Sequence, residues 1–197
     1  EIYNYKHLFK NINVEPNTDS DCEIILHLYK KYGIYQTLRL LDGVFAFILV
    51  DMRKTNTTPS IFVARDPFGV RPLYLLKDTN NKSPLLGFSS QIKSLIGFKK
   101  EYFDISHFPP SYFQEYTFND NRWLLKSTTR YNDIGFQSQF NVELYSIKNI
   151  YSNIVFYLKN AVYKRCSVSD RPIACLLSGG LDSSLICSLV CEYNKEH

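Results

Sequence analysis

The chain has 197 residues, 45% of them hydrophobic and 21% charged, with a net charge of +4. These values are typical of a folded globular protein and exclude a mainly disordered chain or a fibrous repeat. The 23 basic residues barely exceed the 19 acidic ones and form no stripe with aromatic residues between them, so we expect no nucleic-acid partner. No apolar run approaches the roughly 18 residues that a membrane span needs, so we expect no membrane partner.

The spacing of the five cysteines matches neither a secreted disulfide framework nor paired zinc ligands. We therefore predict reduced thiols in a cytoplasmic protein. Cys187 and Cys191 are four residues apart, and we interpret them as small apolar residues on a buried helix rather than as metal ligands. The chain begins with Glu1 and ends shortly after a glycine-rich motif, so we expect a fragment of a longer protein.

The first predicted helix covers residues 21–32. It is preceded by Ser20 in a capping box, S-x-x-E, and followed by Gly33 as a left-handed stop. Residues 35–41 predict a further short turn of helix. The apolar run Val44–Val50 then predicts a strand buried on both faces.

The next segments predict short strands with tight links. We expect residues 61–64 to pair with the preceding strand as a hairpin, strands at 73–76 and 85–88 joined by a polar turn at 78–83, and a brief helix at 91–96. This antiparallel meander with a helix predicts an α+β domain over residues 1–130. Residues 99–140 are predicted to be irregular, as a domain edge and a linker.

The second part of the chain, residues 131–197, has a different pattern. Apolar residues at helical spacing predict an amphipathic helix at 142–164, and the apolar segment Ile173–Leu177 predicts a strand. The motif SGGLDSS follows at 178–184, and helical spacing then resumes. Helix, strand, glycine-rich turn and helix are typical of the opening of an α/β domain with a parallel sheet.

The SGGLDSS motif predicts a phosphate or pyrophosphate site. Gly179 and Gly180 allow a tight turn that brings main-chain N–H groups against a ligand, and Ser183 and Ser184 lie at a helix N-terminus that favours an anion. Asp182 would repel a phosphate unless Mg²⁺ lay between them. The motif is not a Walker loop, because no G-K-[ST] follows the glycines.

SGGLDSS resembles the pyrophosphate loop of the N-type ATP pyrophosphatases. Leu181 within the motif and Leu176 before it resemble the variant of this loop seen in asparagine synthetases. Five further segments resemble, in order, motifs of the glutaminase domain of glutamine-hydrolysing asparagine synthetases: EIYN at 1–4, SDCE at 20–23, LDGVFAF at 41–47, ARDPFGVRPLY at 64–74 and FSSQIKSL at 88–95.

This resemblance implies a fold and two linked reactions. Residues 1–130 would be part of an N-terminal-nucleophile glutaminase, an αββα sandwich that releases ammonia from glutamine. Residues 131–197 would be a linker and the start of an ATP pyrophosphatase domain that uses ATP and Mg²⁺ to form a β-aspartyl-adenylate. Ammonia would then displace AMP to give asparagine, with pyrophosphate also released. The partners implied are the small molecules glutamine, aspartate and ATP, and a homodimer is a candidate assembly.

The resemblance also implies roles for individual residues. Glu1 and Asp21 match positions that hold the α-amino group of glutamine, and two carboxylates suit one ammonium group. The residues implied for ATP and pyrophosphate are Leu176, Ser178, Gly179, Gly180, Leu181, Asp182, Ser183 and Ser184, with Asp182 also implied for Mg²⁺. Arg65 and Asp66 either form an ion pair that braces their turn or line the glutamine pocket, and bracing is the preferred interpretation. The same two alternatives apply to Arg71. The four histidines, His7, His27, His107 and His197, are expected to face solvent rather than to be catalytic.

The sequence also departs from the family pattern. The family nucleophile is a cysteine at the mature N-terminus, and no cysteine of this chain has a free α-amine, so we expect the chain by itself to catalyse neither half-reaction. Ser90 and Gln91 replace an acidic residue of the family motif, and Ser111 stands where glycine is frequent. Three alternatives remain open: a β-lactam-synthetase-like enzyme, another adenylating amidotransferase, and a non-catalytic module. The stretch from Arg65 to Leu73 also fits glutamine phosphoribosylpyrophosphate amidotransferase, but SGGLDSS is not a phosphoribosyltransferase loop.

Overall fold

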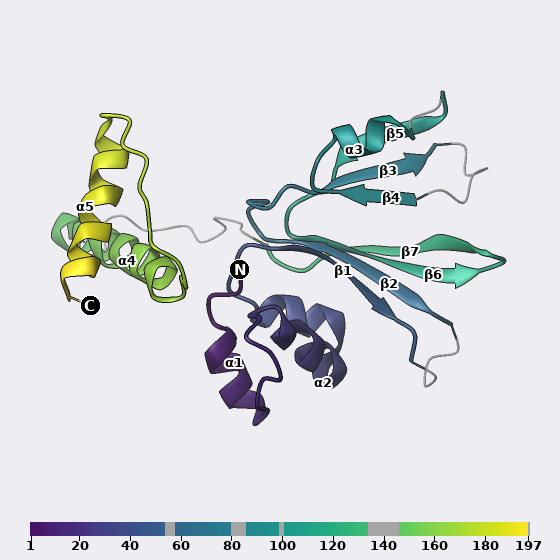
Figure 1. Cartoon of the computed structure of the whole chain (residues 1–197), viewed down its shortest axis with the longest axis horizontal. Helices are drawn as coiled ribbons and strands as arrows, with labels where there is room; N and C mark the ends of the chain where they lie inside the picture. The colour runs from purple at the N-terminus through teal and green to yellow at the C-terminus, as the bar shows by residue number, and fades with distance from the viewer. Residues whose placement is uncertain (54–57, 80–85, 99–100, 134–145, 197) are drawn as a thin grey trace. The chain divides into compact units, whose positions relative to one another are not determined.

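The structure, a computed structural model, describes residues 1–53, 58–79, 86–98, 101–133 and 146–196 (Figure 1). The chain divides into two compact units, residues 1–135 and 136–197. Within the described ranges, none of the helices is long and apolar enough to cross a membrane.

The first unit contains two antiparallel sheets. The four-stranded sheet has the order β1-β2-β6-β7 and consists of β1 (Ala46–Asp51), β2 (Ser60–Arg65), β6 (Tyr112–Asn119) and β7 (Arg122–Arg130). The three-stranded sheet has the order β4-β3-β5 and consists of β3 (Tyr74–Asp78), β4 (Leu86–Ser89) and β5 (Phe103–His107). The predicted β1–β2 hairpin and the predicted pairing of β3 with β4 are both confirmed. The predicted turn at 78–83 extends beyond the described residues.

The prediction of one continuous meander is wrong, because β2 and β3 belong to different sheets. The chain leaves the first sheet after Arg65, and β2 instead takes β6 as its second neighbour, with Val63 opposite Gln114. Short links favour pairing between consecutive strands. Here β2 and β3 do not pair, because the turn at residues 66–73 carries the chain from one sheet to the other.

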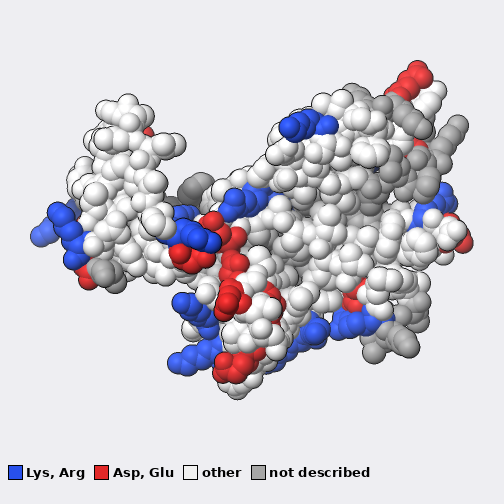
Figure 2. Space-filling view, in the orientation of Figure 1, with Lys and Arg blue, Asp and Glu red and all other residues white. Residues whose placement is uncertain are grey.

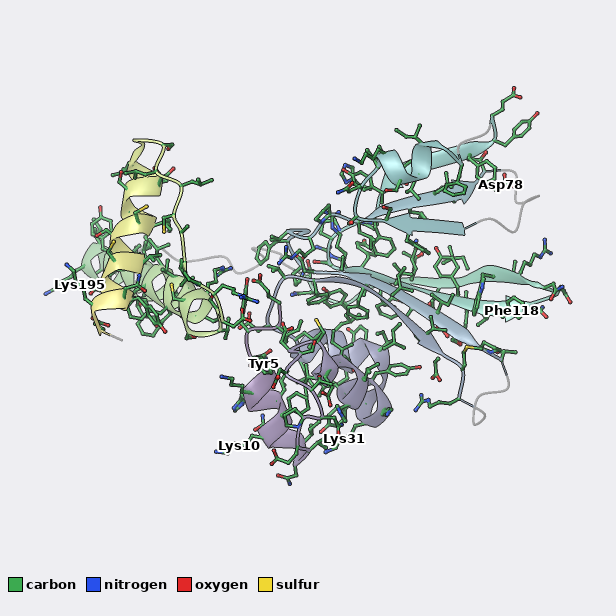
Figure 3. All side chains as sticks on the ribbon, viewed as in Figure 1. Tyr5, Lys10, Lys31, Asp78, Phe118 and Lys195 are labelled. Atoms are coloured by element: carbon green, nitrogen blue, oxygen red, sulfur yellow. The ribbon has the colours of Figure 1, made fainter. Side chains whose placement is uncertain are left out.

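Helices cover the outer face of each sheet in the first unit (Figure 1). Helices α1 (Tyr5–Ile12) and α2 (Glu23–Leu40) pack on the four-stranded sheet, where Ile24 and Leu28 of α2 meet Leu49 and Phe62 in one apolar cluster. A second cluster, with buried Val63, Phe108 and Tyr116, joins the two sheets. The short helix α3 (Lys93–Ile96) packs Leu95 against Leu76 and Phe103 of the other sheet. Figure 3 shows the side chains that fill these layers.

The predicted helix at 21–32 and the turn at 35–41 form the single element α2, which Gly33 interrupts with a non-helical φ of 74°. The stop at Gly33 is therefore confirmed, but the capping box is wrong. The Glu23 carboxylate accepts from the main-chain N–H groups of Asn17 and Thr18, rather than from Ser20. These hydrogen bonds hold the pKa of Glu23 well below its usual range. Ser20 instead accepts weakly from the Cys22 N–H at 3.3 Å.

The prediction that β1 is buried on both faces is also wrong. Leu49 is buried against the helices, whereas Ile48 and Val50 on the opposite face are 48% and 53% exposed. β1 is an edge strand of its sheet. A continuous apolar run could not reveal this, because it looks the same at an edge as at the centre of a sheet.

The prediction of irregular structure over residues 99–140 is wrong for its described part, which contains β5, β6 and β7. Asp120 and Asn121 both have positive φ, 47° and 61°, and form the two-residue turn between β6 and β7. Such turns favour Asn and Asp, and they match the twist of the flanking strands. Phe118 and Trp123 pack across this hairpin with ring centroids 5.1 Å apart. The polar residues of this segment belong to a hairpin rather than to a linker.

In the second unit, the described residues form two helices, α4 (Ile147–Ser167) and α5 (Leu181–Glu196). The predicted helix at 142–164 is confirmed from Ile147 onwards, and residues 142–145 lie outside the described ranges. The Ser146 hydroxyl caps α4 by accepting from the Asn149 N–H at 3.2 Å. The helices pack through Val162, Cys166 and Val190.

Two predictions for this unit are wrong. Residues Ile173–Leu177 form no strand, because residues 146–196 contain no other strand with which they could pair. Cys187 and Cys191 do not lie on a buried helix, because Cys191 is exposed and Cys187 is partly exposed. All five cysteines are free thiols, as predicted.

A buried carboxylate joins α2 to the edge of the four-stranded sheet. Asp51 is 3% exposed, accepts from the Tyr29 hydroxyl at 2.6 Å and is paired with Arg53, whose Nη2 is 2.7 Å from Oδ2. The Arg53 contact, with help from Tyr29, holds the pKa of Asp51 well below its usual range. Burial and the bond to Asp51 raise the pKa of Tyr29 to about 12.

We predict that Asp51→Asn weakens this link and removes part of the acid dependence of stability. Because the folded-state pKa of Asp51 is lowered, its contribution is complete above about pH 4, the unfolded-state value, and disappears as the pH falls through the folded-state value. The substitution should cost about 2 kcal/mol at pH 7 and less at pH 2, measured by urea unfolding. The control is Asp104→Asn at an exposed position of β5. Equal losses at both pH values would contradict the prediction.

Candidate active site

The turn after β2 is organised around the fully buried carboxylate of Asp66, which is 0% exposed. Its Oδ1 accepts from the N–H groups of Phe68 and Val70 at 3.1 and 3.0 Å, and its Oδ2 accepts from Arg71 N–H at 3.0 Å. A carboxylate that accepts three main-chain donors fixes a turn that has no regular secondary structure.

Arg65 holds the same turn from the other side. Its guanidinium donates to three carbonyl oxygens, those of Gly69 at 2.7 Å, Arg71 at 2.8 Å and Phe108 at 2.6 Å. Gly69 has φ of 64°, and a Cβ there would lie 3.0 Å from the Arg65 guanidinium carbon. Arg65 and Asp66 therefore brace the turn, but the expected ion pair between them is wrong. Each side chain bonds the main chain, and the described residues show no ion pair between the two.

Ser111 and Tyr131 attach the turn to the end of the four-stranded sheet. Ser111 has a positive φ of 66° and donates from its N–H to the Asp66 carbonyl and from its hydroxyl to the Pro67 carbonyl. The Tyr131 hydroxyl donates to the Arg65 carbonyl at 2.8 Å. Burial, together with the charge of Asp66, raises the pKa of this phenol well above its usual range.

The predicted ligands Glu1 and Asp21 lie close together. Ile2 forms a β-bridge with Gly43, and the Glu1 main-chain nitrogen donates to the Val44 carbonyl at 2.8 Å. The Ile2 N–H donates to Asp21 Oδ2 at 2.6 Å, and that oxygen is 3.8 Å from the Glu1 nitrogen. Both residues are thus fixed by main-chain contacts, and their side chains remain partly accessible, as a small ligand requires.

Arg71 contributes a third charge to this site. Its Nη2 lies 3.0 Å from Glu1 Oε1, and both side chains are about half exposed or more. Residues from three segments far apart in the sequence therefore meet at Glu1: its carboxylate contacts the Arg71 guanidinium, and its main chain lies beside the Asp21 carboxylate. Acidic and basic side chains are interspersed on the visible face of the first unit (Figure 2). The sum of these three charges suits one further cation, such as an ammonium group.

Three of the five cysteine thiols are disfavoured as nucleophiles by their surroundings. Burial raises the pKa values of Cys22, Cys166 and Cys187, and the nearby Asp21 raises that of Cys22 further. A higher pKa means less thiolate at neutral pH. We therefore assign none of these three thiols a catalytic role.

The described histidines have local partners rather than a shared site. His7 bonds Asn11, and His107 stacks on Tyr74. His27 is partly buried and lies 3.0 Å from Glu23, so the expectation that it faces solvent is wrong. His197 lies outside the described residues.

The SGGLDSS loop lies at the N-terminus of α5, as the sequence predicts. Gly179 has φ of 84°, a conformation that favours glycine, and a Cβ there would meet no atom within 4 Å. The hydroxyls of Ser183 and Ser184 donate to the Gly180 carbonyl at 3.0 and 2.8 Å, and Ser178 Oγ is 3.0 Å from Ser183 Oγ. The loop is exposed except at Ser183, which is partly buried, so its exposed hydroxyls and first-turn N–H groups are accessible to an anion.

Asp182 is an exposed carboxylate in the first turn of α5. Mg²⁺ in nucleotide sites is commonly held by one or two carboxylates together with substrate phosphates, so a single carboxylate here fits that ion. Within the described ranges, no three His, Cys, Asp or Glu side chains form a group that could hold a metal by themselves.

A cavity of about 320 Å³ lies beside α1, and sequence reasoning missed it. Its lining contains none of the predicted site residues and consists of Tyr5, Lys6, Phe9, Lys10, Asn13, Val14, Glu15 and Pro16. The α1 helix was itself not predicted, although apolar Leu8, Phe9 and Ile12 have helical spacing and could have revealed it.

Comparison with known proteins agrees with this division of the chain. A mixed α/β unit with antiparallel sheets at residues 1–136 matches the family described as the glutamine amidotransferase domain, and residues 156–197 match the asparagine synthase family. The chain therefore belongs to the glutamine amidotransferase domain family.

Curated relatives align with the whole chain. The chain is 35% identical over 208 residues to the glutamine-hydrolyzing asparagine synthetase of Homo sapiens, and 36% identical over 208 residues to that of Pongo abelii. It is 35% identical over 212 residues to that of Gallus gallus. In each case the whole chain aligns with 36% of the relative, so the chain spans about a third of the length of these proteins.

We predict that Asp66→Asn unfolds the braced turn. One carboxylate oxygen becomes an amide group that faces main-chain donors, so the substitution should cost about 3 kcal/mol in the free energy of unfolding. Asp120→Asn is the matched control, because Asn also suits the positive φ at that exposed turn. Equal stability of the two variants in urea titrations would show that the carboxylate does not hold the turn.

We predict that Gly43→Ala displaces residues 1 and 2. An added Cβ would overlap the Glu1 carbonyl oxygen and lie 2.9 Å from the Ile2 Cα. The change should cost roughly 1–3 kcal/mol and shift the Ile2 amide resonance. Gly97→Ala is the control, because a Cβ at Gly97 meets no atom within 4 Å. An unchanged Ile2 resonance in Gly43→Ala would contradict the close approach.

Proposed function

We propose that this chain is part of a glutamine-hydrolysing asparagine synthetase. The support is the order of the two family matches, glutamine amidotransferase first and asparagine synthase second, together with relatives of that name over the whole chain. The proposed boundary lies at residues 130/131. The layers of helices and two sheets support an N-terminal-nucleophile αββα sandwich before it.

The observation that carries the proposal is the convergence of Glu1, Asp21 and Arg71. Glu1 and Asp21 are proposed to bind the α-amino group of glutamine, and the position of Asp21 Oδ2, 3.8 Å from the Glu1 main-chain nitrogen, supports this assignment. Paired carboxylates hold an ammonium by charge-assisted hydrogen bonds and orient the rest of the ligand relative to the turn at 66–73.

The loop at 178–184, with Leu176 before it, is proposed to bind ATP at its pyrophosphate. The accessible hydroxyls of Ser178, Ser183 and Ser184 and the N–H groups at the start of α5 would hold the phosphate oxygens. Asp182 would hold Mg²⁺, which when bound offsets the negative charge of the phosphates. This loop and α5 would belong to the start of an ATP pyrophosphatase domain.

The proposed chemistry links the two units through ammonia. Ammonia released from glutamine at the first unit would attack a β-aspartyl-adenylate, which forms from aspartate and ATP with release of pyrophosphate. AMP would leave as asparagine forms. The described residues would contribute binding, orientation and charge to these steps, and none is assigned as the nucleophile.

The free cysteines support a reducing, cytoplasmic setting for this protein. The proposed partners are glutamine, aspartate and ATP. A homodimer is the proposed assembly, and we propose no nucleic-acid ligand.

The test is a comparison of Asp21→Asn and Asp182→Asn in the full-length protein that carries this chain. Asp21→Asn should lower asparagine formation from glutamine at least tenfold and leave formation from ammonium unchanged, because it affects only glutamine binding. Asp182→Asn should lower both activities and AMP release together.

The matched control is Asp170→Asn, at an exposed site of the same unit that should leave both activities unchanged. AMP and asparagine are measured with aspartate and ATP as substrates. An enzyme that releases AMP with another acceptor and not with aspartate would contradict asparagine as the product. Loss of ammonium-dependent activity in Asp21→Asn would contradict the glutamine assignment.

A further inference from the structure

One carboxylate oxygen of Glu1 is hydrogen-bonded to Arg71, and the other is available to a ligand. Arg71 Nη2 occupies Oε1 at 3.0 Å, and Oε2 has no hydrogen-bond partner among the described residues. An unpaired Glu1 carboxylate on an exposed side chain would sample several rotamers, and a ligand would have to order it at an entropic cost.

The main chain of Arg71 is held on both sides of its Cα. Its N–H donates to the buried Asp66 carboxylate, and its carbonyl accepts from Arg65 Nε. The guanidinium therefore extends from a rigid point of the turn and reaches residue 1, which is 70 positions away in the sequence.

From these contacts we infer that Arg71 is a positioning residue for the α-ammonium site. It holds Glu1 in the orientation in which Oε2 and the Asp21 carboxylate receive the ammonium of an α-amino acid. This inference depends on the proposed function, since the ligand is taken to be glutamine. Arg71 acts through Glu1, so its effect should require the amino group of the ligand.

The exposure of the Arg71–Glu1 ion pair sets the expected size of the effect on glutamine affinity. Exposed ion pairs are worth up to about 1 kcal/mol, which corresponds to about fivefold in affinity. Arg71→Met should thus weaken L-glutamine binding about fivefold. Arg71→Lys should restore part of the loss, because an ammonium can still reach the carboxylate but lacks the planar fork of Arg.

The test measures dissociation constants by NMR titration of the full-length protein that carries this chain, with the Ile2 amide resonance as the probe. Two ligands are compared: L-glutamine and 4-carbamoylbutanoate, which is glutamine without its α-amino group. The variants are Arg71→Met, Arg71→Lys, Glu1→Gln, the double variant Arg71→Met/Glu1→Gln, and Asp21→Asn. Arg122→Met, at an exposed site on β7, is the charge-matched control.

The inference predicts that Arg71→Met weakens the binding of glutamine but not the binding of 4-carbamoylbutanoate. It also predicts that the double variant binds glutamine no more weakly than Glu1→Gln alone. Additive losses, or equal losses for both ligands, would overturn it. If Asp21→Asn weakens glutamine binding and Arg71→Met does not, the positioning role of Arg71 is wrong, while the proposed function stands. If the wild-type chain does not bind glutamine at all, the glutamine site fails, and the positioning role fails with it.

Discussion

The first unit depends on one buried pair of side chains, Arg65 and Asp66. Between them they make six hydrogen bonds to main-chain groups, five within the turn at residues 66–73 and one to the Phe108 carbonyl. Buried main-chain polar groups must find partners, and an irregular turn cannot supply them by itself. Burying two charges is costly, and here the cost is offset by these charge-assisted bonds.

That turn also positions a residue of the candidate glutamine site. It carries the chain from the first sheet to the second, and it projects Arg71 towards Glu1. The N-terminal residues are in turn fixed by the Ile2–Gly43 bridge and by Asp21. The charges of the candidate glutamine site therefore depend on a scaffold of main-chain contacts rather than on one element. Substitutions at Asp66 and Gly43 should reach the site through this scaffold.

Much of the first unit could be predicted from local patterns. Gly33 marked the break in α2, and the hydrophobic runs located β1 to β4. The helix α1 was missed although Leu8, Phe9 and Ile12 have helical spacing. The strands β5 to β7 were missed because the polar turn residues between them, Asp120 and Asn121 among them, were interpreted as a linker. Edge position and sheet order depend on contacts between distant residues, which no local pattern contains. This is why Ile48 and Val50 were wrongly placed in the interior.

The site residues could be proposed from motifs, but their arrangement could not. Spacing alone did not show that Arg65 and Asp66 bond the main chain instead of each other, or that Arg71 reaches Glu1. In the second unit, SGGLDSS correctly marked the start of α5. The segment Ile173–Leu177 was predicted as a strand from its composition, but a strand needs a neighbouring strand, and residues 146–196 do not supply one.

The most direct test of the central claim is a crystal structure of this chain with L-glutamine. The account predicts the α-ammonium group within about 3 Å of Glu1 Oε2 and of the Asp21 carboxylate, with the Arg71 guanidinium still on Glu1 Oε1. Glutamine bound elsewhere, or with its amino group directed away from both carboxylates, would contradict the account.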